Sequence, residues 1–242
     1  INLCRFSYMD YSKPCQYSTR LIEKLQSLDT DEVLDFDLIN KAIYWAKKYH
    51  DGQFRKSGEP FYTHPLEVAY LVSEYKLTTN VIVTAILHDI VEDTEVTAGM
   101  ILDEFGRRIE EMVDRLTRDR PDGSKLSVEE ILNNAYAKDD KEVLLIKVVD
   151  RLHNMQTIGA KVYEKQRRAT TETVIHFMSM IMHLNIIKLE EDINKLCTLV
   201  STQQSCYTQQ NFSFAKKSNN QTLPPIFENE ASQIHSLLLQ AT

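Results

Sequence analysis

The stretch from Ala85 to Thr97, AILHDIVEDTEVT, is the most informative part of this sequence. It places five ionisable side chains directly after the apolar run VIVTAIL (81–87), where a plain core helix would continue with leucine or alanine. They are His88, Asp89, Glu92, Asp93 and Glu95. On a helix, His88 and Glu92 share a face, as do Asp89 and Asp93. His88 and Asp89 then reach one metal ion from a single turn, whereas the alternative is a solvated charge cluster at a helix end.

Two further segments carry polar groups in a similar setting. In VLLIKVVDRLHNMQT (143–157), an apolar helical stretch ends at Asp150, with Asn154 and Thr157 four and seven residues further on the same face. In RKSGEPFYTHP (55–65), His64 stands just before a proline, a position that favours an extended residue ahead of a new helix. Two imidazoles and two carboxylates suit one borderline-soft divalent ion and leave coordination positions open. The candidate ligands are His64, His88, Asp89 and Asp150.

The rest of the pattern predicts an all-α bundle. Only six glycines occur, all between Gly52 and Gly159, and no alternating β-branched runs are bounded by hairpin signals. Ser127 with Glu130 forms a capping-box pattern, and Thr97 is a suitable N-cap. The predicted helices cover 18–28, 36–49, 65–76, 80–93, 97–105, 107–117, 127–137, 140–157, 161–183 and 185–199.

Composition predicts a domain organisation and excludes several classes of protein. We expect an N-terminal helical extension (1–35), a main domain (36–200) and a polar tail (201–242) that ends in a short helix, SQIHSLLLQ. Ser, Thr, Gln and Asn make up 15 of the 25 residues from 201 to 225. Such a segment buries too little apolar surface to offset the entropy lost when the chain becomes ordered. The net charge of −7 argues against nucleic-acid binding. No apolar run approaches the roughly 18 residues of a membrane span.

Cysteine usage agrees with a cytoplasmic protein. The four cysteines have no CxxC spacing and lie near the two ends of the sequence, so we expect neither a thiolate metal site nor a disulfide framework.

Taken together and in this order, RKSGEPFYTHP, LHDIVEDT and KVVDRLHNMQT resemble the hydrolase domain of the RelA/SpoT homologues. These bacterial enzymes make and degrade the alarmones guanosine tetra- and pentaphosphate, (p)ppGpp. The resemblance covers about residues 36–200 and implies an α-helical fold of the HD superfamily that binds one manganese ion through the four ligands above. It also implies that Glu92 and Asp93 assist the attacking water. The nucleotide pocket would be lined by Arg55, Lys56, Ser57, Asn154 and Thr157.

The implied reaction is hydrolysis at the 3′-pyrophosphate, which gives GDP or GTP and pyrophosphate in the stringent response. Glu92 and Asp93 would orient or deprotonate a water whose pKa the ion has lowered. Arg55 and Lys56 would supply the local positive charge that an acidic protein otherwise lacks, and Arg55 would also stack on guanine. For His50 and His153 we expect packing or outer hydrogen bonds rather than ligation.

The sequence also departs from the family pattern. Long members continue into a synthetase domain, whereas about 40 mostly polar residues follow position 200 here, so no synthesis is expected from this chain. Gln156 stands where arginine is usual. Two alternatives stay open: a phosphohydrolase for another nucleotide such as NADPH, and an inactive nucleotide-binding remnant. The sequence does not indicate an oligomeric state.

Overall fold

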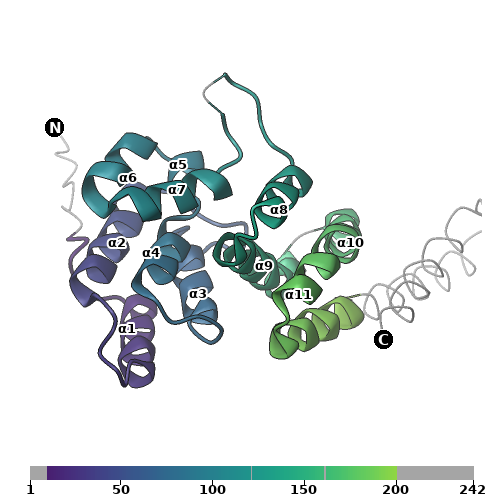
Figure 1. Cartoon of the computed structure of the whole chain (residues 1–242), viewed down its shortest axis with the longest axis horizontal. Coiled ribbons are helices and arrows are strands. Elements are labelled where there is room, and N and C mark those ends of the chain that lie inside the picture. Colours follow the sequence, from purple (N-terminus) through teal and green to yellow (C-terminus); the bar gives the residue numbers. More distant parts are fainter. Residues whose placement is uncertain (1–9, 121, 161, 201–242) are drawn as a thin grey trace, which may run out of the picture. The chain divides into compact units, whose positions relative to one another are not determined.

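A computed structural model describes residues 10–120, 122–160 and 162–200 (Figure 1). Within these ranges every regular element is a helix, and the only β pairings are two isolated bridges, Phe54 with Pro60 and Asp119 with Lys125. The prediction of an all-α chain is confirmed for this part of the sequence. The predicted polar tail and its terminal helix (201–242) lie outside it.

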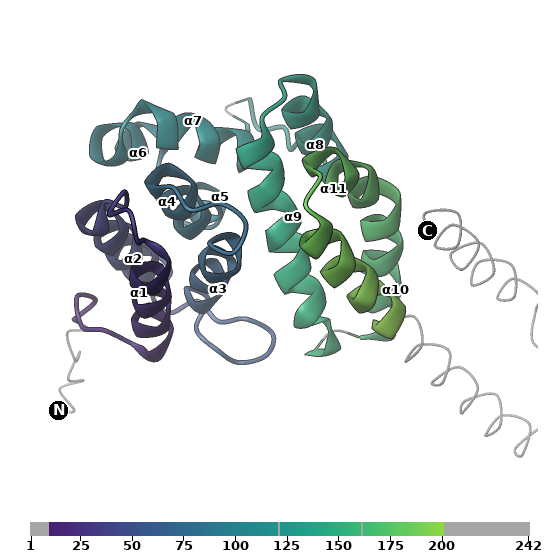
Figure 2. The same cartoon turned by 60° about the horizontal axis from the view of Figure 1, so that its bottom comes forward.

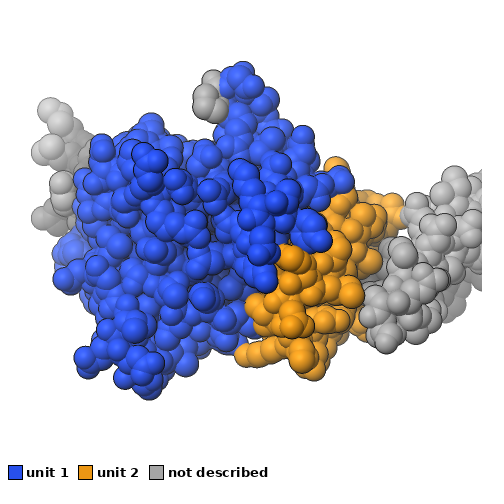
Figure 3. Space-filling view, in the orientation of Figure 1, with its two compact units in different colours: residues 1–150 blue, residues 151–242 orange. Residues whose placement is uncertain are grey.

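The chain divides into two compact units, residues 1–150 and 151–242 (Figure 3). The boundary falls inside helix α9, at Asp150. The predicted domain limits of 36 and 200 stay a prediction. Helices of the first unit are α1 (Gln16–Leu28), α2 (Phe36–Tyr49), α3 (Thr63–Val72), α4 (Thr79–Leu87), α5 (Ile90–Asp93), α6 (Ala98–Phe105), α7 (Arg107–Leu116), α8 (Val128–Ala137) and most of α9 (Lys141–Gln156).

Helix α4 is the centre of the first unit. Each of its residues from Val81 to Leu87 is buried, and it packs against α2, α3 and α7 (Figure 2). A helix that is apolar all round is stable only when neighbours cover every side. Its carboxyl end therefore delivers the next residue, His88, into the interior of the unit.

Both predicted caps are confirmed. The Thr97 hydroxyl accepts from the Met100 amide (3.3 Å) at the start of α6. At α8, Ser127 Oγ accepts from the Glu130 amide (3.1 Å), and the Glu130 carboxylate accepts from the Ser127 amide (2.7 Å). Each cap joins residues that lie within four positions of one another, so it can be predicted from the sequence without the tertiary structure.

The predicted helix 80–93 is wrong as a single element. It breaks at His88 and Asp89, which join α4 to the short α5. The His88 imidazole Nδ1 lies 2.8 Å from the Ala85 carbonyl, the group that accepts from residue 89 in a continuous helix. A side chain that competes for this carbonyl favours a helix end.

The prediction for His64 is also wrong in one respect. Helix α3 begins at Thr63 rather than Pro65 and ends at Val72 rather than 76, so His64 lies inside the first helical turn instead of in an extended residue ahead of it. Pro65 is compatible with this start because amides of the first turn have no intrahelical acceptor.

The second unit contains α10 (Tyr163–Glu172), a π-helical segment (Thr173–Phe177), α11 (Met178–Leu184) and a helix over 187–200. The predicted helices 161–183 and 185–199 are present with these shifted ends. Asn185, with φ of 54°, adopts the left-handed conformation that ends α11. None of the described helices combines the length and apolarity that crossing a bilayer requires.

Candidate metal centre

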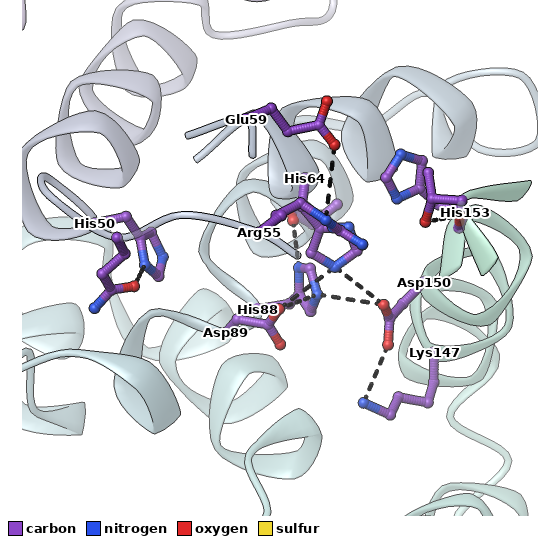
Figure 4. Close-up of polar contacts among 12 residues, drawn as sticks. His50, Arg55, Glu59, His64, His88, Asp89, Lys147, Asp150 and His153 are labelled. Atoms are coloured by element: carbon purple, nitrogen blue, oxygen red, sulfur yellow. Dashed lines mark hydrogen bonds and ion pairs between the residues drawn. The ribbon is translucent and has the colours of Figure 1, made fainter. Parts of the chain in front are cut away.

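Three elements of the first unit bring His64, His88 and Asp150 together (Figure 4). His64 comes from the first turn of α3, His88 follows the last residue of α4, and Asp150 lies on α9. One ligand atom from each of them lies within 4.8 Å of the others. His64 Nε2 is 3.2 Å from Asp150 Oδ1, and the two imidazole rings are 5.3 Å apart at their centroids. His88 lies 24 positions after His64 in the sequence, and Asp150 lies 62 positions after His88, yet the three side chains meet at one point.

Asp89 contributes a fourth donor beside this group. Its Oδ2 atom is 3.1 Å from His88 Nε2 and 3.5 Å from His64 Nε2. Its side chain keeps 21% of its surface exposed, whereas His64 and His88 keep 4% and 0%. The site is therefore closed on the imidazole side and reachable from the Asp89 side.

The geometry fixes the tautomer of His88. The Ala85 carbonyl only accepts, so Nδ1 at 2.8 Å from it must carry a hydrogen. Nε2 is then the atom left for a proton or a metal ion, and it lies buried 3.1 Å from Asp89 Oδ2. An imidazole whose remote nitrogen is held by a backbone carbonyl is the usual arrangement of a metal-binding histidine.

The charges of the site favour a bound cation. Burial lowers the pKa of His88, but the carboxylates of Asp89 and Asp150 outweigh it and raise the pKa to about 9. Burial raises the pKa of Asp89, yet His88 and His64 hold it well below its usual range. Two ionised carboxylates in a protein interior need compensation, and a protonated imidazole provides it when no metal is present.

Lys147 is a further charge at this site that the sequence did not single out. Its ammonium group lies 3.4 Å from Asp150 Oδ2, one turn back along α9, and the side chain is buried. Burial raises the pKa of Asp150, but Lys147, followed by the two histidines, holds it far below its usual range. Lys147 thus engages one oxygen of Asp150 and leaves Oδ1 directed at the imidazoles. The i, i+3 spacing of Lys147 and Asp150 on a helix was the sequence signal that could have indicated this contact.

The acidic pair lies on α5, one turn beyond Asp89. The Glu92 carboxylate accepts from the Arg118 amide (3.2 Å), and Asp93 is partly open to solvent. Partial burial, with Asp89 and Glu92 nearby, raises the pKa of Asp93 to about 6. A carboxyl group that titrates near neutrality is suited to proton transfer.

The RKSG segment forms a tight hairpin that leads into α3. Arg55 exchanges backbone hydrogen bonds with Glu59 and Gly58, each at 2.9 Å, and Ser57 Oγ donates to the Glu59 carboxylate at the same distance. Gly58 has φ of +94°, a conformation that L side chains rarely adopt, so the turn requires glycine. Lys56 and Ser57 are exposed at the tip, and the Arg55 side chain is largely buried, with Nε 3.9 Å from Glu59.

Asn154 and Thr157 belong to the second unit. Thr157 donates its hydroxyl to the His153 carbonyl (3.1 Å) at the end of α9. Their predicted part in the nucleotide pocket stays a prediction.

Comparison with known proteins identifies the family to which the chain belongs. Residues 42–180 match the HD domain family. A GTP pyrophosphokinase of Myxococcus xanthus is 37% identical over 170 residues, which are 67% of this chain and 22% of that protein. The bifunctional (p)ppGpp synthase/hydrolase SpoT of Escherichia coli (strain K12) is 32% identical over 165 residues, 65% of this chain and 23% of SpoT. A guanosine-3′,5′-bis(diphosphate) 3′-pyrophosphohydrolase of Haemophilus influenzae is 35% identical over 156 residues, 62% of this chain and 23% of that enzyme.

The chain thus spans less than a quarter of the length of these relatives. A solved structure described as a metazoan ortholog of SpoT that hydrolyzes ppGpp superposes with a TM-score of 0.54 at 21% identity, covering 76% of this chain and 95% of that one. This likeness supports the fold. The chain belongs to the HD domain family, and its motifs and relatives identify it as an HD domain of the RelA/SpoT type.

Proposed function

We propose that this chain is a manganese-dependent (p)ppGpp 3′-pyrophosphohydrolase. The observation that carries the proposal is the meeting of His64, His88 and Asp150 from three separate helices, with the His88 tautomer fixed for ligation. The names of the relatives point to the substrate, since two of them are described as hydrolases of this alarmone class.

We propose one ion at the site, with Asp89 as the fourth ligand. Imidazole nitrogen with carboxylate oxygen is a donor set that manganese accepts, and it leaves coordination positions open. A bound ion would lower the pKa of a water molecule and neutralise phosphate charge.

Side chains of this protein would transfer the protons and bind the nucleotide. Asp93, assisted by Glu92, takes a proton from the water as its oxygen attacks the 3′-linked phosphorus. The bond from that phosphorus to the ribose 3′ oxygen breaks, this oxygen gains a proton, and pyrophosphate leaves with GDP or GTP as the other product. Arg55, Lys56 and Ser57 bind the nucleotide from the hairpin, and we extend this role to Asn154 and Thr157 as the family resemblance implies.

Metal analysis tests the ligand set. We expect about one manganese ion per chain after dialysis and a strongly reduced content in His88→Ala, because the variant loses a buried donor. His183→Ala, which removes a histidine of the second unit, is the matched control and should retain the ion. Equal occupancy in His88→Ala and wild type would exclude His88 as a ligand.

Metal binding should release protons. In the metal-free protein the raised pKa of His88, about 9, keeps Nε2 protonated at pH 8, and an ion can bind only after that proton leaves. Manganese affinity should therefore rise with pH up to about 9 and level off above it. Calorimetric titrations at pH 8 in two buffers of different ionisation enthalpy measure the release. Identical heats in both buffers contradict this prediction.

The acidic pair is tested by amide variants. Asp93→Asn should retain manganese but slow turnover of guanosine tetraphosphate by roughly 10²–10⁴-fold, the range for a lost acid–base group. Glu92→Gln should also slow it, and Glu95→Gln serves as the control two residues further along. Full activity in both the Glu92 and Asp93 variants would move water activation to another residue.

The hairpin is tested through Arg55. Arg55→Ala should raise KM for guanosine tetraphosphate about 10–100-fold, because a lost charge-assisted contact costs roughly 1.5–3 kcal/mol. Manganese content should stay unchanged, since Arg55 is not a ligand. Kinetics are compared with tetraphosphate, GTP and NADPH as substrates. Turnover of NADPH without turnover of the alarmone, or unchanged alarmone kinetics in Arg55→Ala, contradicts the proposed substrate.

A further inference from the structure

The side-chain amide of Gln53 connects two parts of the site that are 40 residues apart in the sequence. Its Nε2 atom donates to the Asp93 carbonyl at 2.8 Å, and its Oε1 atom lies 2.9 Å from His50 Nδ1. The backbone of Gln53 is fixed as well, since its amide donates to the His50 carbonyl (3.1 Å) and its carbonyl accepts from the Phe61 amide (2.9 Å). Gln53 thus belongs to the hairpin base and holds the end of α5.

The direction of each hydrogen bond follows from chemistry. The Asp93 carbonyl only accepts, so the amide nitrogen of Gln53 faces it. Oε1 is left for His50, so His50 Nδ1 carries the hydrogen and donates. Burial lowers the pKa of His50, which keeps the ring neutral and in this tautomer. The chain of bonds therefore runs in one sense, from His50 through Gln53 to Asp93.

His50 is held in place by packing. It keeps 1% of its surface exposed, and its ring lies 4.8 Å from that of Phe61 at an angle of 33°. Its Nε2 atom is buried without a hydrogen bond among the described residues. A phenylalanine would stack on Phe61 without this uncompensated nitrogen, so the polar edge of the ring serves the bond to Gln53.

Helix α5 needs such support. It has four residues, too few to be stable alone. The Asp93 amide donates to the Asp89 carbonyl (2.9 Å), and the Asp93 carbonyl accepts from Gln53. The backbone of Asp93 is thus bound on one side to a candidate ligand and on the other to Gln53.

We propose that His50 and Gln53 are positioning residues for the acidic pair, and that they fix Asp93 relative to Asp89 and to the hairpin that carries Arg55. The inference rests on the proposed function for the role of Asp93. Loss of either side chain should therefore slow the chemical step without weakening metal binding.

Kinetics with substitutions that preserve shape test this role. Gln53→Met keeps the length of the side chain but removes both bonds, and His50→Phe keeps the ring but removes the donor. Each should lower kcat for guanosine tetraphosphate roughly 10–100-fold, the usual effect of losing an outer-shell partner. Manganese content, KM and the melting temperature should stay close to wild type. His50→Asn, whose amide nitrogen replaces Nδ1, should recover most of the lost kcat.

Gln53→Glu separates the two bonds, because its carboxylate still accepts from His50 but cannot donate to Asp93. It should be as slow as Gln53→Met. Asp51→Asn is the control, since the Asp51 carboxylate accepts from the Tyr11 hydroxyl (2.8 Å), away from Gln53 and Asp93, and it should leave kcat unchanged. Unchanged kcat in Gln53→Met, equal losses in His50→Phe and His50→Asn, or a loss of kcat that follows manganese content would overturn the inference.

Hydrogen exchange tests the same link without substrate. Amides of residues 90–94 should exchange faster in Gln53→Met than in wild type or Asp51→Asn. A wild-type protein that does not hydrolyse the alarmone contradicts the proposed function alone, and exchange then decides the inference. Unchanged exchange in Gln53→Met overturns it.

Discussion

The burial of α4 on all sides is the constraint on which the site depends. Seven consecutive buried residues, Val81 to Leu87, give this helix no face that can turn toward water. Its carboxyl end is consequently fixed in the interior, and His88 emerges where α3 and α9 also arrive. The bond from His88 Nδ1 to the Ala85 carbonyl orients the ring and helps end the helix at the same point. This one hydrogen bond thus orients His88 Nε2 toward the site and begins the turn that places Asp89 beside it.

The electrostatics of the centre follow from this packing. Two carboxylates and two imidazoles are withdrawn from most of the solvent, and Lys147 supplies a positive charge beside Asp150. Without a metal the protonated His88 helps to balance the carboxylates, as its raised pKa indicates. A divalent ion would replace this proton with a stronger and more localised charge. Metal binding, protonation and the geometry of the site are therefore linked.

The groups proposed to bind substrate and transfer protons lie on a hairpin and on the short helix α5, which both need support from elsewhere. The hairpin at residues 53–61 is held by its own backbone bonds, and α5 is held at both sides of Asp93. Rigid helices position the candidate ligands, and side-chain bonds position the segments around them. This division explains why residues of no evident chemical role, such as Gln53, occur so close to the site.

Much of this site was predictable from local patterns. The helical class and the caps at Thr97 and Ser127 follow from residue types and spacing, because these signals act over a few neighbouring residues. The grouping of His64, His88 and Asp150 was predicted through their three motifs and the family that these motifs resemble. The sequence did not indicate the break at His88, since VIVTAILHDIVED has the composition of one helix. It also did not indicate that His64 lies inside a helix or that Gln53 contacts Asp93, whereas the i, i+3 spacing of Lys147 and Asp150 is a local signal for their contact. Those features depend on which carbonyl, carboxylate or ring each side chain meets after folding. Contacts between residues 40 to 90 positions apart exist only once the buried α4 has fixed where its neighbours pack.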